Sequence, residues 1–197
     1  MEKKITIGSM FSEGIGMGLK NALPIIVNTI LWVLTIWIPY LNVGTTIGLM
    51  VGIVAKASKG EVIGMTEIFN PVYRKRMGEY FLTSGFIGMG MLFALPLLFI
   101  PAFVIAISWS QALLLVVDRE KNPMEAIDLS GKCTYGNKGT MFLGYLLIVI
   151  AFSIVAAIFS LLGSFGMILI ALVELVLVFS LIGVQAYIYG KLCQDIE

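Results

Sequence analysis

Long apolar stretches, separated by segments that carry the charges, dominate the pattern of this chain. Turn-forming residues divide the stretches into pairs, within residues 39–42, at Pro96 and Pro101, and within residues 163–166. Proline and glycine end helices or turn the chain, and a helix needs about 20 apolar residues to cross a bilayer. The pattern predicts an all-α membrane protein whose six transmembrane helices form three hairpins, at about residues 22–38, 41–55, 80–95, 99–117, 140–162 and 167–190.

A short segment before each hairpin has the spacing of an amphipathic helix. Phe11, Ile15 and Leu19 recur at i, i+4 and i+8, and Met124, Ile127 and Leu129 suggest a second such face. Pro123 suits the first turn of a helix capped by Asn122. Because the hairpin entrances recur about every 60 residues, we predict one membrane domain over residues 1–197 with a pseudo-threefold repeat, in units of about 5–58, 59–120 and 121–191.

The basic residues indicate an orientation. All 13 lie before the first hairpin, between hairpins or after the last one, and the three hairpin turns carry no charge. The positive-inside rule then places the charged segments and both termini in the cytoplasm. With 59% hydrophobic and only 13% charged residues, against about 25% charged in a typical soluble domain, the expected partner of most of the surface is the lipid bilayer.

The composition also argues against several kinds of chemistry. The chain has no histidine, and its two cysteines are too few and too far apart for a metal centre. Gly14, Gly16 and Gly18 follow no strand, so they do not suggest a phosphate loop. We expect no catalytic residue, metal or cofactor, and the net charge of +1 suggests no nucleic-acid partner. Cys133 and Cys193 fall on the expected cytoplasmic side, where they should remain free thiols.

Glu174 is the only charged side chain inside an expected span. A carboxylate in the membrane costs at least ~2.5 kcal/mol and usually faces protein or water. Ser153 should lie at a similar depth on the other arm of the hairpin, and Thr35 is a further polar candidate in the outer half. These residues would form either a protonatable site on a transport path or a set of structural hydrogen bonds.

Two further clusters have a structural and a functional interpretation. Gly44, Gly48 and Gly52 form a stripe that allows close helix packing, within the chain or in a dimer. Arg74, Lys75 and Arg76 either anchor the topology at an anionic leaflet or dock a cytoplasmic partner. Asn28, Ser108, Ser110 and Gln111 are expected near mid-membrane, where they would form interhelical hydrogen bonds or line a narrow polar cavity.

One region resembles a known family. The residues are 118–126, Ser130, and Tyr135-Gly136-Asn137-Lys138 leading to Phe142, with Gly60, Phe69 and Tyr80-Phe81 similar to an earlier repeat. They resemble an uncharacterised family of six-span bacterial and archaeal membrane proteins, related to the membrane domain of some glycerophosphodiester phosphodiesterases. The resemblance implies a prokaryotic inner-membrane location. It implies no activity, because the phosphodiesterase chemistry belongs to a separate soluble domain with histidine and acidic ligands.

Two hypotheses of function follow from these patterns. The first is a non-catalytic membrane subunit or scaffold whose cytoplasmic segments dock another membrane or cytoplasmic protein. The second is a small transporter or channel with its site at Glu174.

Overall fold

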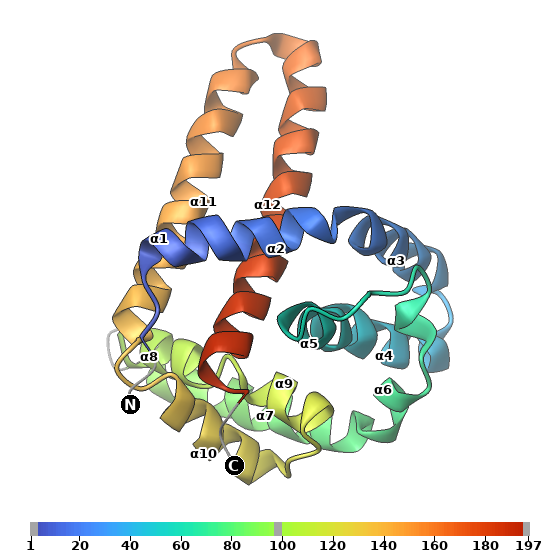
Figure 1. Ribbon diagram of the computed structural model, residues 1–197, viewed down its shortest axis with the longest axis vertical. Coiled ribbons are helices and arrows are strands. Elements are labelled where there is room, and N and C mark those ends of the chain that lie inside the picture. The colour runs from blue at the N-terminus through green and yellow to red at the C-terminus, as the bar shows by residue number, and fades with distance from the viewer. Residues whose placement is uncertain (1–3, 97–99, 195–197) are drawn as a thin grey trace.

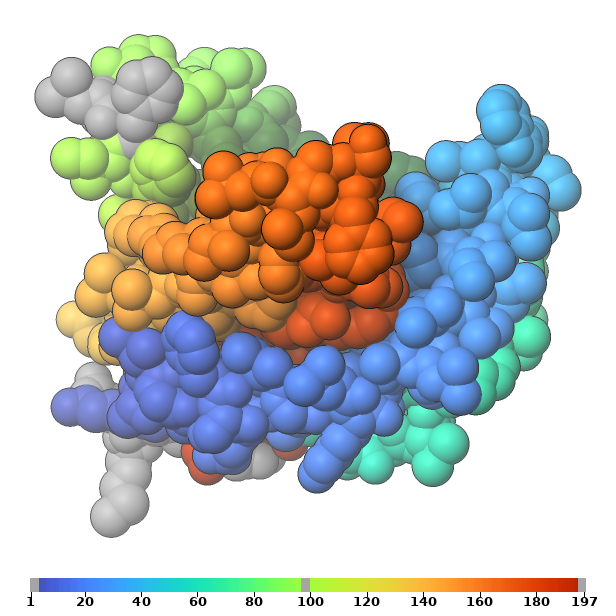
Figure 2. Space-filling model, turned by 90° about the horizontal axis from the view of Figure 1, so that it is seen from above, coloured from blue at the N-terminus to red at the C-terminus, as the bar shows by residue number. Residues whose placement is uncertain are grey.

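The computed structural model describes residues 4–96 and 100–194, and all regular elements in that part of the chain are helices. The described ranges exclude residue 99, where the expected fourth span begins, and residues 1–3 and 195–197 at the two ends of the chain. Shorter helical segments alternate with longer helices along the described residues. The helices point in several directions and do not form one parallel bundle (Figures 1 and 2).

The first unit starts with a continuous helix made of α1 (Ile7–Ser9), the π-helical η1 (Met10–Gly14) and α2 (Ile15–Lys20). It bends by 62° into α3 (Ala22–Thr35). The return arm consists of α4 (Pro39–Ile47), the π-helical η2 (Gly48–Gly52) and α5 (Ile53–Ser58). The prediction of a turn over residues 39–42 is wrong. Pro39 is the first residue of α4, so the turn precedes it. Proline is favoured at that position since the N–H it lacks would have no helical partner.

The second unit contains the short helices η3 (Glu67–Phe69) and α6 (Val72–Lys75), followed by α7 (Met77–Ala94). The return arm is broken into α8 (Ile100–Ser108) and α9 (Ala112–Asp118). In the third unit, α10 (Pro123–Cys133) precedes α11 (Lys138–Ser160) and α12 (Gly163–Leu192). The expected turn over residues 163–166 is also displaced, because α12 already begins at Gly163, whose φ of +60° suits glycine.

The α11–α12 hairpin projects far out of a ring formed by the other helices (Figure 1). Only the C-terminal half of α12 enters the body, where Phe179, Val184, Ile188, Tyr189 and Leu192 are buried. The outer part is apolar and exposed, and Leu161 at its tip is 84% exposed. An uncovered apolar hairpin of this length is typical of a segment whose solvent is lipid.

Within residues 4–96 and 100–194, four helical stretches are long and apolar enough to cross a membrane. They are Pro39–Ser58, Ile100–Asp118, Lys138–Ser160 and Gly163–Leu192. The bent pair Ile7–Lys20 and Ala22–Thr35 would add a fifth. The expected first span is short because α3 has only 14 residues, and α7 is not among the stretches that qualify.

The long helix of the first unit packs across α12 through glycine (Figure 1). Gly14 and Gly18 are buried, and a Cβ on Gly18 would lie 1.9 Å from the Phe179 carbonyl oxygen. Gly183 of α12 faces the same crossing, with the Gly14 carbonyl oxygen 2.2 Å from its would-be Cβ. The buried face of this helix therefore lies one residue before the expected positions Phe11, Ile15 and Leu19. The shift arises because the two backbones approach most closely where glycine leaves no side chain between them.

The apolar face expected for α10 from Met124, Ile127 and Leu129 agrees with the buried face of the helix only at Leu129. Asn122 caps the helix by accepting a hydrogen bond from the Glu125 N–H at 3.0 Å, and Pro123 occupies the first turn as expected. The buried side, however, consists of Ala126, Leu129, Ser130 and Cys133, whereas Met124 is 65% exposed.

Candidate functional site

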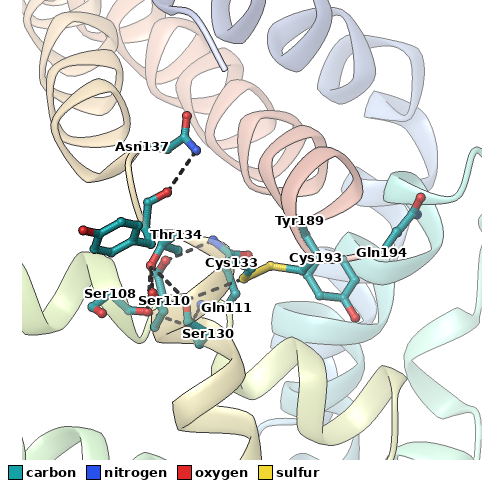
Figure 3. The surroundings of a disulfide bond; sticks show 12 residues. Ser108, Ser110, Gln111, Ser130, Cys133, Thr134, Asn137, Tyr189, Cys193 and Gln194 are labelled. Carbon is teal, nitrogen blue, oxygen red and sulfur yellow. Dashed lines mark hydrogen bonds between the residues drawn. A yellow bond between two sulfur atoms is a disulfide. The ribbon is translucent and has the colours of Figure 1, made fainter. Parts of the chain in front are cut away.

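A break in the return arm of the second unit creates the main polar site. Residues 109–111 leave the helical conformation between α8 and α9, so backbone groups on either side lose their helical partners. Side chains of α10 replace those partners: the Ser130 hydroxyl donates to the Ser108 carbonyl oxygen at 2.7 Å and accepts from the Gln111 N–H at 3.1 Å. The Thr134 hydroxyl also donates to Ser108, at 3.2 Å (Figure 3).

A side chain of α12 completes this network from the other side. The Gln185 amide nitrogen donates to the Ser110 carbonyl oxygen and to the Gln111 side-chain oxygen, both at 3.2 Å. The Tyr145 hydroxyl of α11 donates to the Gln185 oxygen. Gln111 itself is fully buried and donates to the Ser110 hydroxyl at 3.0 Å. Helices α8 to α12 are thus held together by uncharged groups, and Ser108, Ser110 and Gln111 form the hydrogen bonds that one interpretation of the sequence expected.

Ser110, Tyr145 and Gln185 also line an open hollow of about 560 Å³ at the base of the α11–α12 hairpin. The remaining walls are apolar and come from η2, α5, α8, α11 and α12, with Met50, Val149 and Ile182 among them. No charged residue lines this hollow. The second interpretation, that the mid-membrane polar residues line a narrow polar cavity, does not describe this hollow, which is open and has mostly apolar walls although Ser110 lines it.

The two cysteines form a disulfide, contrary to the expectation of free thiols. Cys133 at the end of α10 is bonded to Cys193 just after α12, with their Cα atoms 5.5 Å apart (Figure 3). Both side chains are buried, at 6% and 0% exposure. The expectation failed because it rested on the compartment alone, whereas packing brings the ends of two helices 60 residues apart in sequence into contact.

Charged side chains from the interhelical loops meet near the same end of α12. Asp118 at the end of α9 pairs with Lys59 and accepts a hydrogen bond from the Tyr189 hydroxyl at 2.8 Å. Arg76 pairs with Glu120 at 2.8 Å, and this contact raises the pKa of the guanidinium. The segments after α5, α6 and α9, which are distant in sequence, are tied together by these pairs.

A second polar cluster fixes the segment between α5 and α6. Glu67 is 8% exposed, pairs with Lys56 at 2.8 Å and accepts a hydrogen bond from the Tyr73 hydroxyl at 2.7 Å. Burial alone would raise the pKa of Glu67, but the contacts with Lys56 and Tyr73 lower it below its usual value. Burial and the Glu67 carboxylate raise the pKa of Tyr73. Asn28, fully buried on α3, accepts from the Ile68 N–H at 3.0 Å and donates to the Gly64 carbonyl oxygen at 2.8 Å.

The glycine stripe of the first hairpin packs against this same segment. Added Cβ atoms on Gly44, Gly48 and Gly52 would meet Arg74, Ile68 and Tyr73 within 3.0 Å. The Arg74 guanidinium lies 5.6 Å from the centre of the Tyr40 ring. Arg74 was expected on the cytoplasmic side and Tyr40 at the turn on the opposite side of the membrane. In a simple hairpin these two positions would be about 30 Å apart, yet they are in contact. The first hairpin therefore does not keep its uncharged turn and the charged loop on opposite sides of a membrane.

The expected intramembrane site does not assemble. Glu174 and Ser153 are both exposed on the projecting hairpin, and neither lines the groove between its arms, which is formed by apolar residues such as Phe152, Val155 and Leu172. Thr35 is remote in sequence and hydrogen-bonds to carbonyl oxygens of its own helix, Leu31 at 2.9 Å and Trp32 at 3.2 Å. Other residues line both the groove between the hairpin arms and the hollow at the base of the hairpin.

The outer face of α10 presents a second open hollow, also of about 560 Å³. Trp109 lies at one wall, and Met124, Ile127 and Tyr135 contribute apolar surface. Asp128 and Lys132 form an ion pair of 2.6 Å along the same helix. Tyr135 is 71% exposed, so this amphipathic helix keeps an unfilled apolar face next to charged groups.

No family model, curated protein or solved structure matches the chain. The fold and the hydropathy nevertheless define a class: an all-helical chain with several helices long and apolar enough to cross a membrane.

Sequence reasoning missed four features of this arrangement. The disulfide and the role of Gln185 had no local signal, because their partners are distant in sequence. The α8–α9 break did have a local signal in the sequence, because Ser108, Ser110 and Gln111 interrupt an otherwise apolar stretch. Gly14, Gly18 and Gly183 were recognisable as small residues on helices, but nothing in the sequence pairs them.

Proposed function

We propose that this chain is a non-catalytic membrane subunit or scaffold that docks a partner protein through α10. The observation that carries the proposal is the exposed surface of α10 and the residues just after it, where Met124 and Tyr135 are 65% and 71% exposed beside an open hollow. Exposed apolar side chains next to charged groups are characteristic of protein interaction sites. The inner face of the same helix is held by Ser130 and the disulfide, so the docking surface is presented on a fixed support.

The basic cluster of residues 74–76 is less available for docking than the sequence suggested. Arg74 packs against Gly44 and the Tyr40 ring, and Arg76 is paired with Glu79 and Glu120. Lys75 alone of the three is exposed. Docking is therefore assigned to α10, with Lys75 at most an accessory contact.

The proposal includes a membrane location. We place the chain in a prokaryotic inner membrane with six spans, a threefold repeat and both termini in the cytoplasm, on the strength of the positive-inside distribution and the family resemblance. The Tyr40–Arg74 contact opposes a simple first hairpin. The disulfide at the end of α12 opposes a reducing cytoplasm on that side, so the thiol-labelling experiment in the Discussion decides between this orientation and the inverted one.

Photocrosslinking in native membranes tests the docking surface. A photoreactive residue replaces Met124 or Tyr135 in turn, and Leu161 at the hairpin tip, 84% exposed, is the control position. We expect one discrete heavier product from positions 124 and 135 and none of that size from position 161. Charge reversal of the rim, with Asp128→Lys and Lys132→Asp together, keeps their ion pair and should weaken the product. Identical products from all three positions, or none from α10, would refute the proposal.

The transporter hypothesis receives no specific support from the geometry. Of its proposed residues, Glu174 and Ser153 are exposed on the projecting hairpin, and Thr35 hydrogen-bonds within its own helix.

A further inference from the structure

The hollow at the base of the α11–α12 hairpin combines apolar walls with one compact polar group. Ser110, Tyr145 and Gln185 form that group, and residues such as Met50, Val149 and Ile182 surround it. None of the described lining residues is charged. A charged ligand would therefore lose its hydration without gaining a counter-ion from them, which is costly. The lining therefore selects an uncharged polar group attached to an apolar body.

The hydrogen-bond inventory of the three side chains shows which uncharged group fits. Both amide hydrogens of Gln185 are used, toward Ser110 and Gln111. The Tyr145 hydroxyl hydrogen is used toward Gln185, and the Ser110 hydroxyl hydrogen toward the Ile107 carbonyl oxygen at 2.8 Å. No lining side chain thus retains a donor that is not already engaged.

Acceptor capacity, in contrast, remains on all three. A phenolic or hydroxyl oxygen and an amide oxygen each have two lone pairs. The Gln185 oxygen accepts one bond, from Tyr145, and the Ser110 hydroxyl accepts one, from Gln111. A group that enters the hollow can therefore donate a hydrogen bond to these oxygens without breaking the network, whereas a group that only accepts finds no partner.

We propose that this hollow binds a lipid-soluble alcohol, with its chain against the apolar walls and its hydroxyl donating to the Tyr145–Gln185–Ser110 cluster. This site is separate from the α10 surface, so it does not depend on the proposed docking function. Val149 is 41% exposed and lies at the wall, which gives the chain of the alcohol a route in from the lipid side.

The test uses a matched pair of probes on the purified protein in nanodiscs. A diazirine-bearing 12-carbon alcohol is photoreacted with the protein, and dodecan-1-ol competes against its methyl ether, which has the same chain and no donor. We expect labelling of peptides that contain Tyr145 or Gln185. The half-competing concentration should be about five- to tenfold lower for the alcohol, as one net hydrogen bond predicts.

Three variants separate the site from general partitioning. Val149→Trp fills the hollow, keeps all three polar side chains and should abolish the labelling. Val155→Trp, in the groove between the hairpin arms and 40% exposed, should leave it unchanged. Tyr145→Phe should keep the labelling but reduce the preference for the alcohol. Equal competition by alcohol and ether, absence of saturable labelling, or labelling that survives Val149→Trp would each overturn the proposal.

Discussion

Single glycines decide how closely the first long helix approaches α12. Gly18 faces the Phe179 carbonyl group at a distance that leaves no room for a methyl group, whereas nothing lies within 4 Å of a Cβ added to Gly16 two positions earlier. In a lipid environment such small-residue crossings provide much of the helix–helix packing energy. The two glycines therefore have opposite tolerance to the same substitution.

We predict that Gly18→Ala destabilises the protein by about 1–3 kcal/mol or more, the usual cost of overpacking. Gly16→Ala is the matched control and should be neutral or slightly stabilising, because alanine favours a helix over glycine by roughly 0.5–1 kcal/mol. Thermal unfolding in a mild detergent, followed by tryptophan fluorescence, measures both. Equal melting temperatures for the two variants would show that the helices do not cross at Gly18.

Glu67 makes the stability of the segment between α5 and α6 dependent on pH. Its contacts with Lys56 and Tyr73 lower the pKa of the folded carboxyl below the ordinary value of 4.5. A lowered pKa means that the folded state holds the proton less tightly than the unfolded state, so the ionised group stabilises the fold above pH 4.5. This contribution is lost as the pH falls through the lowered pKa.

Glu67→Gln should therefore reduce stability at neutral pH by about 1–3 kcal/mol, because Lys56 and Tyr73 lose a buried partner. It should also flatten the fall of stability below pH 4.5. Glu61→Gln, an exposed position in the same segment, is the control. Melting temperatures between pH 3 and 7 test this, and parallel curves for wild type and Glu67→Gln would contradict it.

At the scale of elements, α10 is held in place from three directions. Its hydroxyl groups supply partners for the α8–α9 break, its cap orders its first turn, and its last residue is bonded to the end of α12. The break explains why polar residues interrupt an apolar stretch: in the absence of water, freed backbone groups need side chains from neighbouring helices.

The disulfide should be detectable as an intact Cys133–Cys193 peptide pair by mass spectrometry without reductant. It closes a loop across a separation of 60 residues, for which loop entropy gives a stabilisation of about 4 kcal/mol. Reductant and Cys133→Ser should therefore lower the melting temperature to a similar extent, and reductant should not change the variant further. Free thiols in protein purified under alkylating conditions would restore the expectation from the sequence.

At the scale of the whole molecule, the projecting hairpin and the paired loops define two different surfaces. The hairpin is apolar and uncovered, while the segments after α5, α6 and α9 exchange ion pairs with one another. The proposed orientation places the hairpin tip outside and the paired loops inside. The first hairpin is the exception, because its turn contacts Arg74.

Thiol labelling of intact cells tests this orientation in a background without the native cysteines. Cysteine in place of Ser164 at the hairpin tip should react with an impermeant reagent added outside, and cysteine in place of Lys59 or Lys121 should not. The six-span proposal expects labelling of cysteine in place of Asn42 as well. Protection of that position alone would contradict six spans, and a reversed pattern would invert the orientation.

The sequence by itself determined the helical class and the presence of several helices long and apolar enough to cross a membrane. These follow from apolar periodicity, from proline and glycine, and from the cost of charge in lipid, all of which act locally. Even the cap and first turn of α10 were predictable, because Asn122 and Pro123 act within four residues of each other.

Only the tertiary structure decided which helices meet. The Cys133–Cys193 bond, the Gly18–Phe179 crossing, the contact of Arg74 with Tyr40 and the union of Tyr145, Gln185 and Ser110 each join residues distant along the chain. In an apolar helix most side chains are interchangeable in hydropathy, so the pattern carries little information on the partner. The partner helix is selected by the shape of the packing surface and by backbone groups that lack a helical partner. Both arise only when the helices have packed.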